Sequence, residues 1–217
     1  MSYEQKEREA LQTGVNKTPK LEIPLIKYFW QSNSLNRDQK DNIPKFFRNL
    51  KMLSSFTDNE LRILTQHFHL RNFETNEVIF EQDQVGFGFY IIYSGHVDIQ
   101  VRQYFTKDDS AKELNLTGDV MIPVAHLERN DYFGELALLQ ENSLRTATAI
   151  ASERCALLGL FKPDMDQLLE YHPLIAAKLL KAISMLLANR ITNVTSEIKA
   201  LKLKIEMMEK NVSISKV

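Results

Sequence analysis

The sequence has few of the residues that build disulfides, membrane spans or strongly charged surfaces. It contains one cysteine, Cys155, so no disulfide can form within the chain, and a single thiol fits the reducing cytoplasm. No apolar run approaches the roughly 20 residues of a membrane-spanning helix. The polar segment 1–11 lacks the apolar stretch of a secretory signal. We therefore expect a cytoplasmic protein with no membrane partner.

Neither positive nor negative charge is in excess, because the formal net charge is −1. A strongly basic stripe is not expected, which argues against a nucleic-acid partner. The composition is otherwise that of a globular protein, with 44% hydrophobic and 25% charged residues. A chain of 217 residues can form one well-packed domain with appendages.

Changes in residue type and apolar spacing along the chain divide it into three regions. Residues 1–42 are predicted to be a partly helical extension, 43–172 a β-domain with flanking helices, and 173–217 a long helix. Within the extension, apolar residues of the segment 21–32 recur at helical spacing. This segment packs on its own domain or offers a docking face to a partner, and the sequence leaves both readings open. No internal repeat is visible.

The β-domain is predicted to begin with helices over 43–70. Thr57 and Glu60 have the spacing of a capping box, which predicts a helix start, and Leu61, Leu64 and Phe68 then line one face. A residue pattern typical of strands begins at Phe73. The predicted strands, which are rich in β-branched and aromatic residues, are 78–80, 89–93, 96–101 and 120–127. Residues 103–119 form a polar hairpin tip, and the whole predicts an antiparallel β-barrel or jelly roll in an α+β protein.

The segment Phe133–Thr148, FGELALLQENSLRTAT, has the chemistry of a site for a sugar phosphate. Gly134 permits unusual dihedrals, and the short helix predicted after it can present backbone N–H groups to an anion. Arg145 offers a fork of donors that suits a phosphate. The carboxylate of Glu135 would repel a phosphate but can accept a hydrogen bond from a sugar hydroxyl. Together these groups suit a ligand with both ribose and phosphate.

This segment resembles the phosphate-binding cassette of cyclic-nucleotide-binding domains. That family includes bacterial catabolite-activator proteins, regulatory regions of protein kinases A and G, and cyclic-nucleotide-gated channels. The resemblance extends upstream to NEVIFEQDQVGFGFYIIYSGHVDI at 76–99 and downstream to HPLIAAKLL at 172–180, covering about residues 45–195. Two departures are Asn130, which tolerates left-handed dihedrals and stands where the family usually has glycine, and Leu144, where many eukaryotic members have proline. Neither removes a group that contacts the ligand.

The resemblance implies a role for each cassette residue. Glu135 would take the ribose 2′-hydroxyl, and Arg145 would bind the exocyclic oxygens of the cyclic phosphate. The residues implied to bind the nucleotide are Gly134, Glu135, Leu136, Ala137, Arg145, Thr146 and Ala147. Cyclic AMP is the expected ligand, because bacterial domains of this type mostly resemble cyclic-AMP sensors. Cyclic GMP is second, because Thr146 resembles the residue of cyclic-GMP-responsive members. A degenerate domain that keeps the fold and binds nothing is the alternative.

Other candidate sites are weaker. His67 and His69 form a potential metal pair, but no third ligand stands near them in sequence, so we expect surface histidines at a helix end and no metal site. His96, His126 and His172 are isolated. Cys155 is expected to be a buried, inert thiol. No serine lies in a nucleophile-elbow pattern, so we expect a non-enzymatic protein without a cofactor.

The C-terminal region carries a heptad pattern. Leu187, Val194, Leu201 and Met208 are seven apart and alternate with a second apolar set at Ile191, Ile198 and Ile205. This pattern is typical of a parallel two-stranded coiled coil and predicts a homodimer, the alternative being a lone helix packed on the barrel. In the domain family such a helix closes over the base. The residues implied as lid contacts are Asn189, Arg190 and Asn193.

Two classes of function remain open from the sequence. The first is a cyclic-nucleotide sensor that dimerises and acts by contacting another, unidentified protein. The second is a transcription regulator of the catabolite-activator type. Residues 211–217 are too few for a helix-turn-helix, so we expect the first class, with a chain that carries no output domain of its own.

Overall fold

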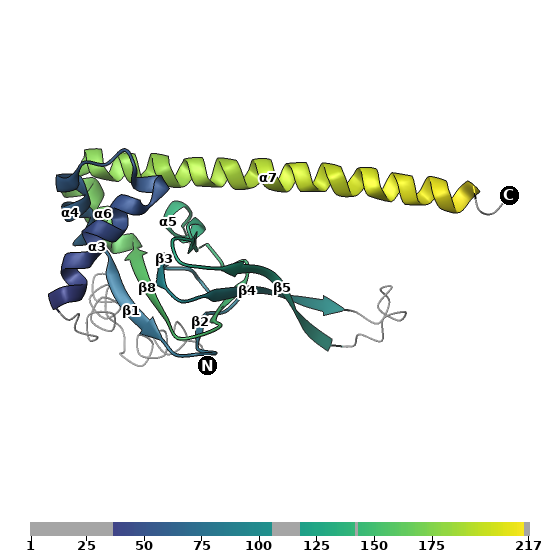
Figure 1. The fold of residues 1–217 in the computed structure, drawn as a ribbon, viewed down its shortest axis with the longest axis horizontal. Coiled ribbons are helices and arrows are strands. Elements are labelled where there is room, and N and C mark those ends of the chain that lie inside the picture. Colours follow the sequence, from purple (N-terminus) through teal and green to yellow (C-terminus); the bar gives the residue numbers. More distant parts are fainter. Residues whose placement is uncertain (1–36, 106–117, 142, 215–217) are drawn as a thin grey trace.

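The computed structural model describes residues 37–105, 118–141 and 143–214, which form a β-sandwich flanked by helices (Figure 1). One antiparallel sheet has the strand order β1-β8-β3-β6 and the other β2-β7-β4-β5. The strands are β1 (His69–Phe73), β2 (Val78–Phe80), β3 (Gly88–Ser94), β4 (Val97–Phe105), β5 (Gly118–Leu127), β6 (Tyr132–Phe133), β7 (Thr148–Ala151) and β8 (Cys155–Phe161). The predicted jelly roll with helices around it is confirmed.

Most of the helices gather at one end of the sandwich (Figure 1). They are α3 (Arg37–Asn49), the 3₁₀ turn η2 (Lys51–Leu53), α4 (Asp58–Thr65), α5 (Leu136–Leu139), α6 (Lys162–Tyr171) and α7 (Pro173–Ile214). Helix α3 spans the predicted boundary between residues 42 and 43. The amphipathic segment 21–32 lies outside the described residues, so both readings of it stay predictions.

The sheet containing β8 is buried on both faces, which explains its unbroken apolar sequence. All seven residues of β8 are buried. Alternate side chains of a strand point to opposite faces: Leu157 and Phe161 join the core between the sheets, whereas Leu158 and Leu160 join the core beneath the helices. A sheet covered on both sides loses the polar–apolar alternation of a half-exposed strand. This sheet therefore packs against the helices on one face and against the second sheet on the other.

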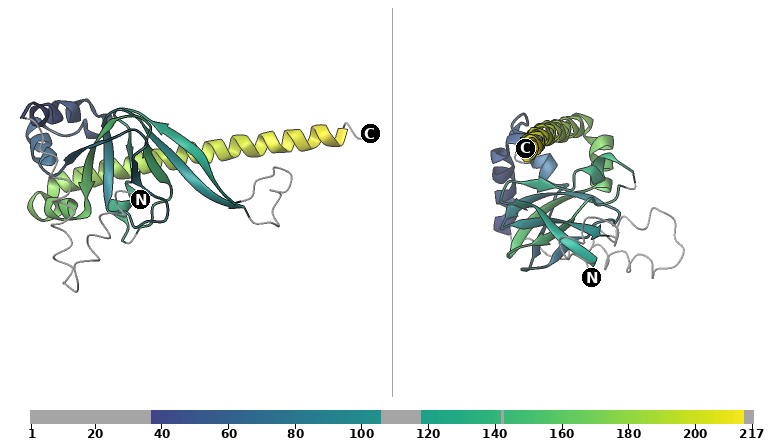
Figure 2. Two further views of the ribbon diagram at one scale, coloured as in Figure 1. Left: turned by 90° about the horizontal axis from the view of Figure 1, so that it is seen from below. Right: turned by 90° about the vertical axis from the view of Figure 1, so that its right-hand side faces the viewer.

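Helix α7 is one continuous helix of 42 residues that runs along the sandwich and extends beyond it (Figures 1 and 2). Its first turns are bound to the domain, since Ala176, Leu179 and Ile183 are buried. From Ile191 to Met208 its large apolar side chains are exposed; Ile191 is 66% and Leu201 59% exposed. The predicted heptad seam is therefore uncovered in the single chain. None of the helices of the described residues is long and apolar enough to cross a membrane.

Three sequence predictions need correction. The helical region was predicted to reach residue 70, but β1 begins at His69. His69 is not a surface residue: it is 8% exposed, and its Nε2 lies 3.0 Å from Oδ2 of the buried Asp164 at the start of α6. A carboxylate 95 residues away in sequence could not be foreseen as its partner. The predicted hairpin tip at 103–119 is shorter than expected, since β4 and β5 pair as far as Phe105 and Gly118.

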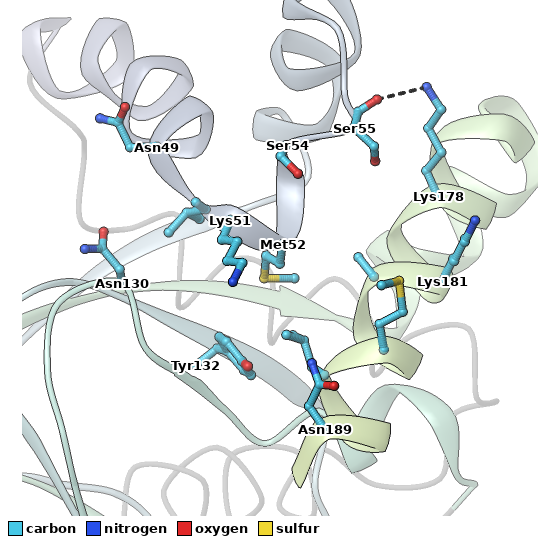
Figure 3. A pocket seen from close by; sticks show the side chains of 14 residues that line it. Asn49, Lys51, Met52, Ser54, Ser55, Asn130, Tyr132, Lys178, Lys181 and Asn189 are labelled. Carbon is cyan, nitrogen blue, oxygen red and sulfur yellow. Dashed lines mark hydrogen bonds between the residues drawn. The ribbon is translucent and has the colours of Figure 1, made fainter. Parts of the chain in front are cut away.

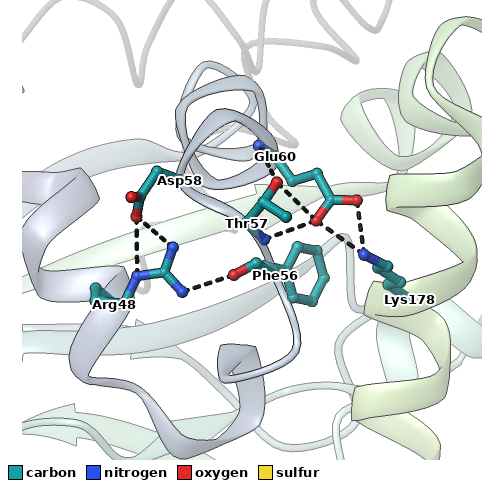
Figure 4. Close-up of polar contacts among 6 residues, drawn as sticks. All are labelled: Arg48, Phe56, Thr57, Asp58, Glu60 and Lys178. Atoms are coloured by element: carbon teal, nitrogen blue, oxygen red, sulfur yellow. Dashed lines mark hydrogen bonds and ion pairs between the residues drawn. The ribbon is translucent and has the colours of Figure 1, made fainter.

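A polar network ties the N-terminal helices to α7 (Figure 4). The capping box is confirmed: Thr57 Oγ1 accepts from the Glu60 N–H, and Glu60 Oε2 accepts from the Thr57 N–H at 2.7 Å. The same carboxylate accepts from Lys178 Nζ at 2.7 Å. Lys178 first, and the Thr57 backbone second, hold the pKa of the Glu60 carboxyl below its usual value. One residue thus caps α4 and anchors α7.

Replacing Thr57 by alanine tests the cap. Thr57→Ala removes the acceptor for the Glu60 N–H and should lower the free energy of unfolding by about 1 kcal/mol. Thr57→Ser keeps the hydroxyl and is the matched control. Urea titrations of the two variants and the parent measure the difference. Equal urea midpoints for the alanine and serine variants would show that the Thr57 hydroxyl does not contribute to the free energy of unfolding.

Candidate functional site

The cassette segment leaves the sandwich through a glycine that no other residue could replace without strain. Gly134 follows β6 with φ of +78°, in the region that favours glycine. A Cβ on Gly134 would lie 2.6 Å from Arg145 Nη1. The chain then forms the single turn α5, as the run of helix-forming residues after Glu135 predicted. Both the dihedral and the close approach therefore require glycine at this position.

Arg145 is buried, only 4% exposed, beneath the cassette. Its Nη1 donates to the carbonyl of Gly88 at 3.0 Å and to that of Gly134 at 3.3 Å. The guanidinium lies over the ring of Phe80, 3.9 Å from its centroid, where the ring quadrupole attracts a cation. Burying a cation is expensive unless such groups surround it. The contacts therefore hold a positive charge in an enclosed position.

Backbone bonds fix where Arg145 enters the site. Its N–H donates to Gln84 O at 2.7 Å, and its carbonyl accepts from the Asp83 N–H at 2.8 Å. Gly86 lies in the same turn, and a Cβ on it would meet Arg145 Cζ at 3.1 Å and Ala137 Cβ at 3.0 Å. A larger residue at position 86 would displace the guanidinium or the cassette turn. The turn at 83–86 is therefore part of the site.

Glu135 is likewise buried, with 5% exposed, and its charge is paired from the long helix. Arg190 Nη1 of α7 donates to Glu135 Oε1 at 2.5 Å, while Arg190 Nη2 donates to the Tyr132 carbonyl at 2.8 Å. The second carboxylate oxygen, Oε2, accepts no hydrogen bond from the residues that the structure describes. Arg190 thus ties α7 to the cassette and leaves one oxygen of Glu135 uncommitted among these residues.

The remaining predicted residues are placed differently from one another. Ala137 is buried, and its N–H already donates to Gly134 O at 3.2 Å, whereas Leu136 is half-buried. Thr146 is exposed and Ala147 half-buried. Of the three predicted lid residues, Arg190 alone has a hydrogen bond to the cassette among the described residues. Asn189 lines a cleft that Tyr132 also lines (Figure 3), and Asn193 is exposed.

Asn130 confirms one reading of the sequence. It replaces the usual glycine and adopts φ of +79°, a left-handed conformation that asparagine tolerates.

Sequence reasoning missed three groups that hold Arg145. They are the ring of Phe80, the carbonyl of Gly88 and the ring of Tyr90, whose centroid is 5.5 Å from the guanidinium. The two aromatic residues had been read only as strand formers. A backbone acceptor leaves no signal in a side-chain pattern, so the role of the Gly88 carbonyl could not be predicted.

Chemistry other than binding finds little support in the described residues. No group of three or more His, Cys, Asp or Glu in this part of the chain could hold a metal ion. Cys155 is buried as predicted, and burial raises the pKa of its thiol to about 12, so a reactive thiolate is disfavoured. A buried cation and a buried carboxylate that has one oxygen uncommitted among the described residues together suit recognition of a small polar ligand with both an anionic group and a hydroxyl.

Comparisons with known proteins agree with the family resemblance inferred from the sequence. The family described as "Cyclic nucleotide-binding domain" matches residues 70–172. The cAMP-activated global transcriptional regulator CRP of Pasteurella multocida is 25% identical over 141 residues, covering 65% of this chain and 59% of that protein. The chain thus spans less than two thirds of the length of this relative.

Solved structures show the same fold. The catabolite activator protein of Thermus thermophilus is 27% identical with a TM-score of 0.55, covering 70% of this chain and 62% of that one. A cyclic nucleotide-binding domain from Methylobacillus flagellatus has a TM-score of 0.59 at 18% identity, covering 74% and 83%. The resemblance stated from the cassette residues is thereby confirmed.

Proposed function

We propose that this chain, whose residues 70–172 belong to the cyclic nucleotide-binding domain family, is a cyclic AMP sensor and not an enzyme. In this proposal it forms a homodimer through α7 and signals by contacting another protein. The observation that carries the proposal is the buried Arg145, enclosed by carbonyls and aromatic rings directly beneath the cassette turn. Its charge and fork of donors match a cyclic phosphate.

The ribose is assigned to Glu135. Arg190 occupies Oε1 of this carboxylate, and Oε2 is available to a 2′-hydroxyl. A hydroxyl bound to a charged acceptor contributes about 1.5–3 kcal/mol. Gly134, Leu136, Ala137, Thr146 and Ala147 would complete the contacts around phosphate and base. In a degenerate domain that binds nothing, a buried glutamate and a buried arginine would serve only stability, and burying charge is a costly way to gain stability.

Arg190 is the lid residue best supported by its contacts. It reaches from α7 to both Glu135 and the Tyr132 carbonyl, so the position of α7 and the state of the cassette are linked. A ligand that favours this closed arrangement over an open one shifts the population toward it. Asn189 and Asn193 would contribute only if α7 turned or moved on closure.

The dimer is proposed on the exposed apolar seam of α7. Ile191, Val194, Ile198, Leu201, Ile205 and Met208 are each between 48% and 66% exposed in the single chain. Contiguous exposed apolar surface of this kind marks an interaction site, and the heptad spacing fits a second copy of the same helix. Leu187, at the start of the seam, packs against the core of its own domain.

The output of the sensor is proposed to be a protein contact. The relative from Pasteurella multocida is a transcriptional regulator by its name, which keeps the second class of function as the alternative. The net charge of −1 does not favour a nucleic-acid surface on this chain.

Isothermal titration calorimetry with cyclic AMP tests the ligand. We expect Arg145→Ala to weaken binding by roughly 2–4 kcal/mol, because it leaves a buried phosphate without its counter-charge. Arg154→Ala is the matched control, since Arg154 is exposed and pairs with Glu74 far from the cassette. Circular dichroism checks that both variants are folded. Unchanged affinity of the folded Arg145→Ala variant for cyclic AMP would show that Arg145 does not bind the phosphate.

Competition binding separates the two nucleotides. We expect cyclic GMP to bind no more than about tenfold less tightly than cyclic AMP, since the Thr146 hydroxyl offers one hydrogen bond worth about 1 kcal/mol. Thr146→Ala should then change the ratio by less than about tenfold. A preference for cyclic GMP above tenfold that disappears in Thr146→Ala would reverse the assignment of the ligand.

Light scattering tests the dimer. Ile198→Asp together with Leu201→Asp places charges inside the seam and should give a monomer at low micromolar concentration. Leu203→Asp is the control: Leu203 is equally exposed, at 57%, but lies outside the heptad seam. We expect this control to remain dimeric. A dimer that survives the double substitution would be held by another surface.

A further inference from the structure

The position of Arg145 depends on the turn at 83–86, because the chain at and before the arginine pairs with this turn. The Gly86 N–H donates to the Ser143 carbonyl at 2.8 Å, two residues before Arg145. The backbone N–H and carbonyl of Arg145 bond to the same turn at 2.7 and 2.8 Å. The arginine is therefore held in place only as firmly as the turn itself.

The turn contains a residue in a conformation that its own sequence does not favour. Asp83 has φ of +67°, in the left-handed region. Aspartate tolerates this region better than most residues, but a residue without the freedom of glycine stays there only where surrounding contacts fix it. Asp83 is exposed, so burial does not hold it. Other groups must fix the turn, and two glutamine side chains next to Asp83 do so.

The Gln84 side chain closes the turn from within. Gln84 is buried, only 7% exposed. Its Oε1 accepts from the Glu81 N–H at 3.2 Å, and its Nε2 donates to Glu81 Oε2 at 3.0 Å. An amide can accept and donate in this way, whereas a carboxylate at position 84 could only accept and would repel Glu81. The amide thus fixes the residue whose carbonyl accepts from the Arg145 N–H.

The Gln82 side chain fastens the turn to the second sheet. Its Oε1 accepts from the Arg102 N–H at 2.6 Å, and its Nε2 donates to the Arg102 carbonyl at 3.4 Å. Strand β7 pairs with β4 only as far as Thr148 and Gln100, so Arg102 lies beyond the end of that pairing. The Gln82 N–H also donates to Thr148 Oγ1 at 3.0 Å. One amide therefore satisfies both backbone groups of Arg102 and ties the turn to β4.

We propose that Gln82 and Gln84 are positioning residues of the nucleotide site: their amides hold the turn at 83–86 so that Arg145 presents its guanidinium to the phosphate. This role rests on the proposed function of the cassette. Neither glutamine contacts the nucleotide in this proposal. Without the amides Asp83 can leave its left-handed conformation, and the backbone of Arg145 moves with it. A binding group needs such support, because a small displacement of the group weakens its contact with the ligand.

Calorimetry with cyclic AMP and its two phosphorothioate diastereomers tests this role. Each analogue has sulfur in place of one exocyclic oxygen, and sulfur is a weak hydrogen-bond acceptor. The ratio of the Kd of an analogue to that of cyclic AMP therefore reports on the arginine contact. We expect Gln82→Met and Gln84→Met each to weaken cyclic AMP by about fivefold or more, the loss of about one hydrogen bond. Each should also lower the larger of the two Kd ratios, as Arg145→Ala does.

The Kd ratio separates positioning from stability. A variant that is only less stable loses affinity for all three ligands equally, so its ratios stay those of the parent. Glu81→Gln keeps an oxygen that accepts from Gln84 and should bind cyclic AMP as the parent does, whereas Glu81→Met should resemble Gln84→Met. Gln167→Met makes the same replacement at an exposed position of α6 and should leave all three affinities unchanged. Unchanged ratios in both glutamine variants would overturn the proposal.

Nuclear magnetic resonance follows Arg145 without a ligand. Its guanidinium lies 3.9 Å from the centroid of the Phe80 ring, so the ring current shifts its side-chain signals. Gln82→Met and Gln84→Met should move these signals, while those of Arg71, 4.6 Å from the Phe73 ring, stay in place as a reference. Arg145 signals that do not move in either variant would also overturn the proposal. If the parent does not bind cyclic AMP, the proposed function fails, and these signals alone decide whether the amides hold Arg145.

Discussion

Enclosure of the Arg145 guanidinium is the constraint on which the rest of the site depends. A buried cation must be surrounded by acceptors and polarisable groups. Two carbonyls and the ring of Phe80 do this, and Gly86 and Gly134 leave the space in which the group fits. The turn at 83–86 and the cassette turn must therefore keep their positions relative to each other. In this account the same constraint prepares a fixed positive site before any ligand arrives.

Helix α7 joins the two regions that flank this site. Lys178 binds it to the cap of α4 through Glu60, and Arg190 binds it to the cassette through Glu135. Between these two attachments α7 lines a cleft, and beyond them the exposed seam begins. A change at the cassette that altered the Arg190 contact would act on a continuous helix of 42 residues. The proposed signal is such a change, passed along one rigid element to a surface that a second copy covers.

The sequence predicted those features that local pattern or motif carries. The capping box at Thr57, the strands at β2 and β3 and the left-handed Asn130 follow from residue type and spacing. The buried pair of His69 and Asp164 joins residues 95 positions apart, and no local signal announces such a contact. The carbonyl of Gly88 and the cleft are products of tertiary packing. Arg190 was predicted only as one of three lid residues, because position along a helix does not say which side chain reaches a carboxylate.

The most direct test of the account compares cyclic AMP with 2′-deoxy cyclic AMP in the parent chain and in Glu135→Gln. Loss of the 2′-hydroxyl should weaken binding to the parent by about tenfold or more, because a hydrogen bond to a charged acceptor contributes roughly 1.5–3 kcal/mol. In Glu135→Gln the two nucleotides should differ much less, since the charged acceptor is gone. Equal affinity of the parent for both nucleotides would contradict the account, because it would leave Glu135 without a ligand to recognise.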